Sequence, residues 1–372
     1  MHLTLHVTNQ CNLDCKYCFV GRGPERMSFD VAKAAVDFGV RHGKSTGILF
    51  YGGEPLLERE LIYKVIEYAQ EIKVKTSHNF YYKMTTNGVL LDEDFLKFAR
   101  EINLTIGFSH DGLAQDDCRC FPDGGGSFDI LQNKIPLLLK YQPYATAMSV
   151  MDTRTIHRAA ETVKFLFDSG FRYITQGINY DRKAPWTSAQ LEIMRREYAK
   201  MAEMYIAWSK AEEKFYLSPF EMKILSHIKG EKYNADRRNM NQEQPSIAPD
   251  GKLYYGSRYV SDPNFEIGDV FSGFDRAKQE NLIEYGGQIS KPCRECAIKT
   301  RCNYVYDSLN MVDGKIVCDI APLQCAHEQI ITPIADKVAE TLYEERNALF
   351  IHKHYNELYP MVSLVEDRGG HL

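Results

Sequence analysis

The sequence predicts an α/β protein: a partial (β/α)6 TIM-like barrel of parallel strands, followed by a smaller cysteine-rich domain. Three observations support this prediction. Six short β-rich runs alternate with amphipathic helical runs in the first half of the chain, a pattern typical of parallel strands with right-handed crossovers. Polar, glycine-rich stretches follow four of these runs, at the strand ends where ligands bind in such sheets. Five of the ten cysteines lie in the last third of the chain.

The length fits two domains, and the composition fits a protein in an aqueous compartment. The 372 residues are 44% hydrophobic and 26% charged, with a formal net charge of −5, and a domain takes about 150 residues. This mild acidity predicts neither nucleic acid nor a membrane as a partner. We find no export signal and no run of about 20 apolar residues. We therefore expect a cytoplasmic protein, whose clustered cysteines bind metal rather than form disulfides.

The strands and helices of the barrel follow in order. Each predicted strand is rich in β-branched and aromatic residues, and each helix has apolar residues spaced for one buried face. Ser28 is the predicted N-cap of the first helix. The predicted strands are 2–8, 47–53, 80–88, 103–112, 144–151 and 171–181, and the predicted helices are 29–43, 60–72, 92–101, 129–140, 156–170, 187–214 and 333–350.

These elements divide the chain into four parts. The barrel comes first, a helical bridge follows, and the cysteine-rich domain precedes a C-terminal helix and tail. The predicted boundaries are 1–185, 186–239, 240–330 and 331–372.

Three cysteines stand close together directly after the first strand. Cys11, Cys15 and Cys18 form a C-x3-C-x2-C loop. A four-iron cluster normally takes four thiolates, one for each iron, and a structural zinc site also takes four ligands. Three thiolates therefore leave one iron open to a substrate or cofactor. A zinc knuckle is the alternative interpretation.

This loop resembles the cluster-binding motif of the radical S-adenosylmethionine (radical SAM) superfamily. The resemblance implies that Cys11, Cys15 and Cys18 hold a [4Fe-4S] cluster whose open iron binds the amino and carboxylate groups of S-adenosylmethionine. An electron from such a cluster cleaves the sulfonium and gives a 5′-deoxyadenosyl radical, which abstracts hydrogen from the substrate. Tyr17 matches the aromatic residue of the family motif, which implies a place beside the adenine.

The stretch "YGGEP" (51–55) resembles the glycine–glycine–glutamate motif of the same family. The resemblance implies that Gly52 and Gly53 let the backbone approach the cofactor, since neither residue has a Cβ. It implies that Glu54 accepts a hydrogen bond from the methionyl amino group. A strand-end turn without ligand contact is the alternative.

Two further strand ends, "TTNG" (85–88) and "FSHDG" (108–112), also resemble family motifs. The resemblance implies that Asn87 and Ser109 bind the ribose or the carboxylate of the cofactor and that Arg119 pairs with the carboxylate. Asp111 is interpreted as a residue that shapes the turn. The two cysteines that flank Arg119 are expected to be free thiols.

The second cysteine group, "KPCRECAIKTRCN" (291–303), resembles the SPASM extension of peptide-modifying radical SAM enzymes. The resemblance implies one auxiliary [4Fe-4S] cluster on Cys293, Cys296, Cys302 and Cys325. Cys318 is the alternative fourth ligand, and a four-thiolate zinc site is the alternative to a cluster. A fully ligated cluster suits electron relay or structural support.

The chain departs from the SPASM pattern at three places. Gly256 and Tyr306 stand where the family has cysteines, and no cysteine precedes Ser246 in this region. These positions serve one auxiliary cluster in the family. We therefore expect that the first auxiliary cluster is missing.

The resemblance implies an enzyme that modifies a ribosomally synthesised precursor peptide by a thioether or carbon–carbon crosslink. Its expected partners are that peptide and an electron donor of the flavodoxin or ferredoxin type. Ser257 stands where sulfatase maturases have an aspartate, which disfavours formylglycine formation. Addition of a peptide strand around residues 246–260 is one way to bind the precursor. The alternatives are a radical SAM enzyme for a small molecule and a non-catalytic zinc protein.

Overall fold

The computed structural model describes residues 1–181, 184, 186–230, 244–288, 290–303, 309–318 and 322–367. One eleven-stranded sheet has the order β13-β12-β11-β10-β1-β3-β4-β5-β7-β8-β9. Its central strands are β1 (His2–Thr8), β3 (Ser45–Gly52), β4 (Asn79–Thr86), β5 (Thr105–Ser109), β7 (Thr146–Met151) and β8 (Tyr173–Ile178). All neighbours among these six pair in parallel, which confirms the predicted α/β class.

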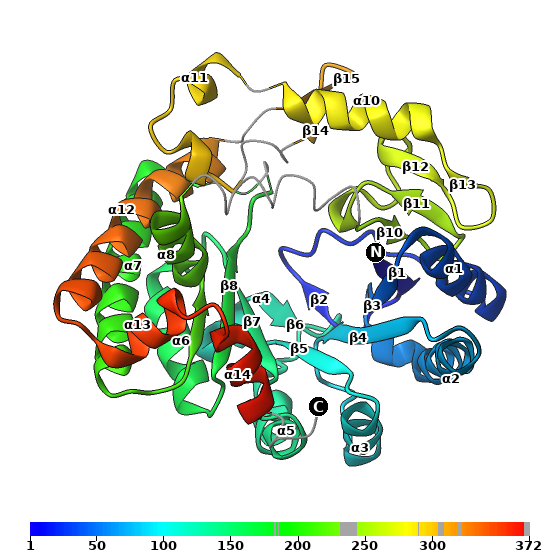
Figure 1. The fold of residues 1–372 in the computed structure, drawn as a ribbon, viewed down its shortest axis with the longest axis horizontal. Helices are drawn as coiled ribbons and strands as arrows, with labels where there is room; N and C mark the ends of the chain where they lie inside the picture. Colours follow the sequence, from blue (N-terminus) through cyan, green and yellow to red (C-terminus); the bar gives the residue numbers. More distant parts are fainter. Residues whose placement is uncertain are drawn as a thin grey trace.

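Helices cover the outer side of the curved sheet (Figure 1). These helices are α1 (Phe29–His42), α2 (Arg59–Thr76), α3 (Glu93–Glu101), α5 (Phe128–Tyr141) and α6 (Ala159–Asp168). The Oγ of Ser28 accepts a hydrogen bond from the Val31 N–H at 3.3 Å, as predicted for the N-cap of α1. The helices bury their apolar faces against the sheet, and this contact forms the main hydrophobic core.

Alternation along β1 separates the core from the inner face of the barrel. Leu3, Leu5 and Val7 belong to the hydrophobic core. Because successive side chains of a strand point to opposite faces, His6 lies on the inner face. Its ring packs edge-on against Tyr51 of β3, with ring centroids 5.2 Å apart. The inner face therefore carries aromatic and polar side chains close to the strand ends.

The sheet continues beyond the six predicted strands on both sides. β9 (Tyr216–Ser218) pairs in parallel with β8 and precedes α8 (Phe220–Lys229). On the other side, β10 (Ser246–Ile247) pairs in parallel with β1. β10 and β11 (Lys252–Tyr254) each have a strand on both flanks, so the predicted addition of a peptide strand to them is wrong. The cysteine-rich region therefore shares one sheet with the barrel.

The rest of the cysteine-rich region contains the sheet strands β12 and β13, two helices and a separate two-stranded hairpin. They are β12 (Glu266–Asp269), β13 (Gly273–Phe274), α10 (Arg276–Gly287), α11 (Lys291–Arg294), β14 (Leu309–Val312) and β15 (Lys315–Cys318). Asp313 and Gly314 join β14 to β15 with φ values of 49° and 74°. Two positive φ values are typical of a tight hairpin turn, and the sequence predicts a turn at these residues.

The C-terminal helix differs from its prediction. The structure has α12 (Pro322–Glu344), α13 (Ala348–Tyr355) and α14 (Tyr359–Asp367) in place of one helix over 333–350. The predicted helix begins at Pro333, whereas Pro333 lies inside α12. Arg346, at φ 52°, separates α12 from α13. In the part of the chain that the structure describes, no helix has the length and apolar content needed to cross a membrane.

The ends of β1 and β3 approach each other very closely. The Gly53 N–H donates to the Thr8 carbonyl at 2.8 Å. A Cβ at Gly53 would lie 2.0 Å from the Gln10 carbonyl oxygen, and one at Gly52 would lie 2.3 Å from that of Thr8. Gly52 also has φ +126°, a conformation that favours glycine. Both glycines are therefore required by the backbone of the cysteine loop itself.

This contact predicts a large cost for Gly53→Ala. The new Cβ overlaps a backbone oxygen that cannot rotate away, so we expect a loss of about 2 kcal/mol or more in the free energy of unfolding. Urea denaturation of the metal-free protein measures this loss. Gly21→Ala is the control, because no atom lies within 4 Å of a Cβ at Gly21. Equal stability of the two variants would contradict the prediction.

Candidate functional site

The first cysteine group lies at the carboxyl end of β1, inside the curve of the sheet (Figure 1). Its β2 (Asp14–Cys15) pairs with β6 (Arg119–Cys120), so that Cys15 lies opposite Arg119. The Lys16 N–H donates to the Cys118 carbonyl at 2.9 Å. The cysteine loop is thus fixed on one side to the end of β3 and on the other to the segment after β5.

The three thiols of the loop lie close enough for their charges to interact. Burial raises the pKa of Cys11 to about 11, and the charges of Cys15 and Cys18 raise it further. Burial also raises the pKa of Cys15, whereas the Arg119 guanidinium acts in the opposite direction. A cysteine binds metal as its thiolate, so a bound cation would offset the free-energy cost of ionising these sulfurs.

Cys11 and Cys15 also receive contacts from the neighbouring strand ends. Asn87 Nδ2 lies 3.7 Å from the Cys11 Sγ, and Arg119 Nη1 lies 3.9 Å from the Cys15 Sγ. Among the described residues, no three His, Cys, Asp or Glu side chains are arranged around a single-ion position. The thiolates of an iron–sulfur cluster bind separate irons, so they lie farther apart than the ligands of a single ion.

Glu54 joins the ends of β3 and β4. Its side chain is fully buried. Oε1 accepts from the Leu56 N–H at 3.0 Å and from the Thr86 hydroxyl at 2.7 Å, and Oε2 accepts from the Asn87 N–H at 2.8 Å. Burial raises the pKa of Glu54 to about 7 although these bonds lower it. Glu54 therefore positions Asn87, and its contact with a methionyl amino group stays a prediction.

Asn87 and Ser109 both lie at strand ends next to the loop. Asn87 Nδ2 donates to Asn12 Oδ1 at 2.7 Å, and its Oδ1 accepts from the Val89 N–H at 3.1 Å. Ser109 is the last residue of β5 and is 8% exposed. The predicted contacts of both residues with ribose or carboxylate remain predictions.

Arg119, Asp111 and Tyr17 form a buried network beside Cys15. Arg119 Nε lies 3.1 Å from Asp111 Oδ2, and the Tyr17 hydroxyl donates to the same oxygen. The Arg119 guanidinium lies 5.2 Å from the centre of the Tyr17 ring. Asp111 Oδ1 also accepts from the Val150 N–H at 2.8 Å. Asp111 thus holds both predicted cofactor residues, a role that goes beyond shaping a turn.

His6 is a site residue that the sequence did not indicate. Its side chain is fully buried, and neither ring nitrogen has a hydrogen-bond partner. Burial lowers the pKa of His6 to about 4, so the imidazole is neutral. Its partner Tyr51 directly precedes Gly52, and the charge of Cys18 contributes to the raised pKa of Tyr51. His6 therefore contacts a tyrosine whose pKa is raised by the charge of a thiol in the cysteine loop.

The second cysteine group lies against the N-terminal part of α12. Burial raises the pKa of Cys325, and the charges of Cys296 and Cys293 raise it further. Gln329 Nε2 lies 3.6 Å from the Cys296 Sγ. Cys318 instead lies at the end of β15 opposite Leu309. Tyr306, one of the three departures from the cysteine pattern, lies outside the described residues.

The raised pKa of Glu54 predicts a pH-dependent stability. An unfolded carboxyl group has a pKa of 4.5 and the folded one has a pKa of about 7, so the folded state binds the extra proton between these values. The free energy of unfolding therefore falls as pH rises through this window, by up to about 1.4 kcal/mol per unit. Urea denaturation of the metal-free protein at several pH values measures the slope. Glu54→Gln lacks this contribution, and identical slopes in both proteins would refute the assignment.

Comparison with known proteins agrees with this geometry. Residues 5–166 match the Radical SAM superfamily. An uncharacterized protein of Methanocaldococcus jannaschii, MJ0907, is 31% identical over 196 residues, which are 52% of this chain and 66% of that protein. The cysteine-type anaerobic sulfatase-maturating enzyme of Clostridium novyi is 28% identical over 180 residues, which are 45% of this chain and 48% of that enzyme. The matches thus span about half to two thirds of these relatives.

Solved structures share the fold over more of the chain. The structure titled "His6 tagged anSMEcpe with bound AdoMet" has a TM-score of 0.74 at 18% identity and covers 92% of this chain and 99% of its own. Streptococcus suis SuiB bound to precursor peptide SuiA has a TM-score of 0.55 at 14% identity, with 82% and 71% covered.

Radical SAM proteins bind a [4Fe-4S] cluster and S-adenosylmethionine, and the residues after β1 suit these groups. Burial raises the pKa values of Cys11 and Cys15, and the Arg119 guanidinium lies 3.9 Å from the Cys15 Sγ. The spacing of Cys11, Cys15 and Cys18, their position at the end of β1 and the family match all agree. Residues 5–166 of this chain therefore form a radical SAM domain.

Proposed function

We propose that this chain is a radical SAM maturase that installs a thioether or carbon–carbon crosslink in a ribosomally synthesised precursor peptide. The observation that carries the proposal is the presence of two separate sets of cysteines in one chain. One is a three-thiol loop at the end of β1, and the other is a cysteine group on α11 to α12. The second group suits an auxiliary cluster on Cys293, Cys296, Cys302 and Cys325.

Each group of residues has a role in this proposal. The three thiols of the first loop would hold the cluster, and the cluster would supply the electron for cleavage of S-adenosylmethionine. Arg119 holds a positive charge 3.9 Å from the Cys15 sulfur. Glu54 fixes the backbone at the end of β4, and Asn87 is thereby presented to the thiol loop. The electron donor would be a flavodoxin or a ferredoxin.

Two solved structures with peptides support a peptide substrate. SuiB was solved with its precursor peptide SuiA, and anSMEcpe was solved with AdoMet and the Kp18Cys peptide. A small-molecule substrate is favoured by one weaker match, the GTP 3′,8-cyclase of Geobacter sulfurreducens, at 31% identity over 25% of this chain. That match covers a much smaller part of the chain than either peptide-bound structure.

Sulfatase maturation is the second candidate function. It is favoured by the names of several relatives, among them a Clostridium perfringens enzyme that is 22% identical over 77% of this chain. Against it, the position of the family's aspartate holds Ser257, whose hydroxyl lies 2.9 Å from that of Ser246. A hydroxyl is a far weaker base than a carboxylate.

A peptide assay separates these candidates. The reduced, reconstituted protein is incubated with S-adenosylmethionine and either a short cysteine-containing precursor peptide or a sulfatase-derived peptide. The proposal expects the first peptide to lose two hydrogen atoms in mass. Resistance to thiol alkylation then identifies a thioether, whereas a cysteine that is still alkylated identifies a carbon–carbon crosslink. Formation of an aldehyde on the sulfatase peptide alone would favour the second candidate. Consumption of neither peptide would favour a small molecule.

The thiol loop predicts the effect of Cys15→Ala. The variant should form no 5′-deoxyadenosine from S-adenosylmethionine and dithionite, because an iron loses its thiolate. Cys120→Ala is the control, since Cys120 lies in the strand that pairs with Cys15 but its thiol donates to the Asp116 carbonyl. Chromatography of the quenched reaction measures the product. Its persistence in Cys15→Ala would contradict the assignment of the loop.

The second cysteine group predicts a difference between Cys325 and Cys318. A variant with alanine at Cys11, Cys15 and Cys18 should retain about four irons, the content of one cubane cluster. Adding Cys325→Ala should remove most of this iron, because Cys325 lies near Cys293 and Cys296. Adding Cys318→Ala should not. Iron, sulfide and zinc analysis after anaerobic purification checks this, and zinc in place of iron would favour the zinc-site alternative.

A further inference from the structure

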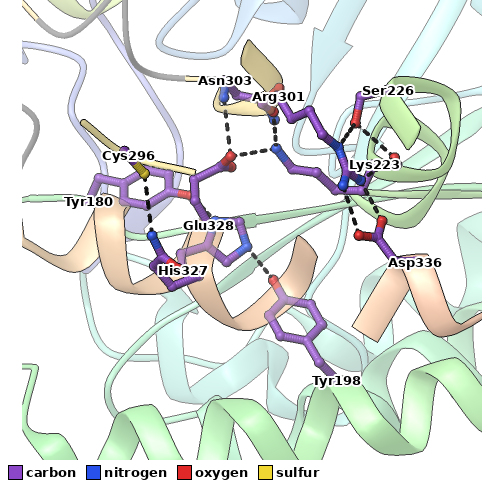
Figure 2. Close-up of polar contacts among 11 residues, drawn as sticks. Tyr180, Tyr198, Lys223, Ser226, Cys296, Arg301, Asn303, His327, Glu328 and Asp336 are labelled. Carbon is purple, nitrogen blue, oxygen red and sulfur yellow. Dashed lines mark hydrogen bonds and ion pairs between the residues drawn. The ribbon is translucent and has the colours of Figure 1, made fainter. Parts of the chain in front are cut away.

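The loop that contains Cys302 is tied to a buried ion pair between α8 and α12 (Figure 2). Lys223 Nζ lies 2.5 Å from Glu328 Oε2, and the two side chains are 0% and 1% exposed. Lys223 Nζ also donates to the Arg301 carbonyl at 2.9 Å, and Glu328 Oε2 accepts from the Asn303 N–H at 3.2 Å. These are the peptide groups on either side of the Cys302 Cα.

We propose that Lys223 and Glu328 are positioning residues that fix Cys302 for metal binding before the metal arrives. The inference rests on the auxiliary cluster of the proposed function. The two peptide groups set the backbone of Cys302, which has φ −73° and ψ 130°. They therefore also set the direction of its Cα–Cβ bond. A ligand held in this way loses less conformational freedom when it binds.

The presence of an ion pair in place of an apolar pair supports a role for Lys223 and Glu328 beyond joining α8 to α12. Burying an ion pair costs several kcal/mol for each charge, and apolar pairs of similar volume often give equal or greater stability. An apolar pair, however, cannot donate to the Arg301 carbonyl or accept from the Asn303 N–H. The particular contribution of Lys223 and Glu328 is thus the fixed geometry of Cys302.

The same face of α12 serves three of the four proposed ligands. Cys325 lies three residues before Glu328 and four before Gln329, and residues at these spacings are neighbours on a helix surface. Cys325 is itself a proposed ligand, Glu328 holds the backbone of Cys302, and Gln329 contacts the Cys296 Sγ at 3.6 Å. α12 therefore acts as the template on which the loop with Cys296 and Cys302 is arranged.

The residue before Cys302 is held by its side chain as well. The Arg301 guanidinium pairs through two nitrogens with Asp336 of α12. It also donates to the Ser226 hydroxyl and the Lys223 carbonyl of α8, both at 3.2 Å. Figure 2 shows these contacts side by side with the ion pair. The loop is thus fixed to α8 and α12 independently of any metal.

α12 is in turn fixed to the barrel by His327, the residue before Glu328. The His327 ring lies between two tyrosine hydroxyls, with Nδ1 3.0 Å from Tyr180 and Nε2 2.7 Å from Tyr198. Burial lowers the pKa of His327 to about 3, so the ring is neutral and donates to one tyrosine while it accepts from the other. Tyr180 follows β8 and Tyr198 belongs to α7 (Ser188–Lys210).

The test uses the full chain with alanine at Cys11, Cys15 and Cys18, so that only the auxiliary cluster remains. The rate of iron loss to an added chelator and the electron paramagnetic resonance spectrum of the reduced cluster are measured. Lys223→Met should accelerate iron loss about 10- to 100-fold, the range for residues that support metal ligands. The double variant Lys223→Met with Glu328→Met should lose iron equally fast while its thermal unfolding midpoint stays close to that of the parent.

Lys353→Met is the matched control. Lys353 pairs with Glu221 of α8 in a similarly buried site and donates to the Phe215 carbonyl at 2.6 Å instead of to the cysteine loop. It should lower thermal stability and leave the rate of iron loss and the spectrum unchanged. Equal rates in the Lys223 and Lys353 variants would overturn the positioning role. A parent protein without iron would instead overturn the auxiliary cluster itself.

Discussion

The close contact between the backbone after β1 and the backbone after β3 is the constraint on which the thiol site depends. No side chain fits at Gly53, because the Gln10 carbonyl oxygen occupies the space. The next residue, Glu54, turns inward and satisfies backbone N–H groups of its own turn and of the β4 end. Buried N–H groups need such partners. The result is a rigid edge of three strands, with Cys11 held against Asn87.

The central sheet could be predicted because each of its strands is long enough to show a pattern. β1, β3 and β4 have seven or eight residues each, and helices with one apolar face follow them. β9 and β10 have only three and two residues, too few for any periodicity. Their place in the sheet is decided by pairing with β8 and β1, which depends on the folded barrel. Pro333 misled the prediction of α12, because proline in a helix interior is rare.

The site residues also divide into those that a local sequence pattern predicts and those that only the folded chain brings into contact. The spacing of the three thiols and the glycines of "GGEP" are local signals, and sequence analysis was sufficient to find them. The contact of Arg119 with Cys15 joins residues 104 positions apart, and that of Lys223 with Glu328 joins residues 105 apart. Asp111 was interpreted as a turn residue since its two partners, Tyr17 and Arg119, converge on it only in three dimensions. Local sequence carries no record of such convergence.

The position of α12 after the cysteine loop in the chain has a consequence for biosynthesis. Chains emerge from the ribosome N-terminal end first and fold in that order, so Cys293, Cys296 and Cys302 leave the ribosome before α12 exists. During that interval the loop lacks Glu328, Asp336 and the last proposed ligand. Its thiols are then exposed to oxidation and to whichever metal is available. Loading of the proposed auxiliary cluster is therefore expected only after α12 has been synthesised and folded.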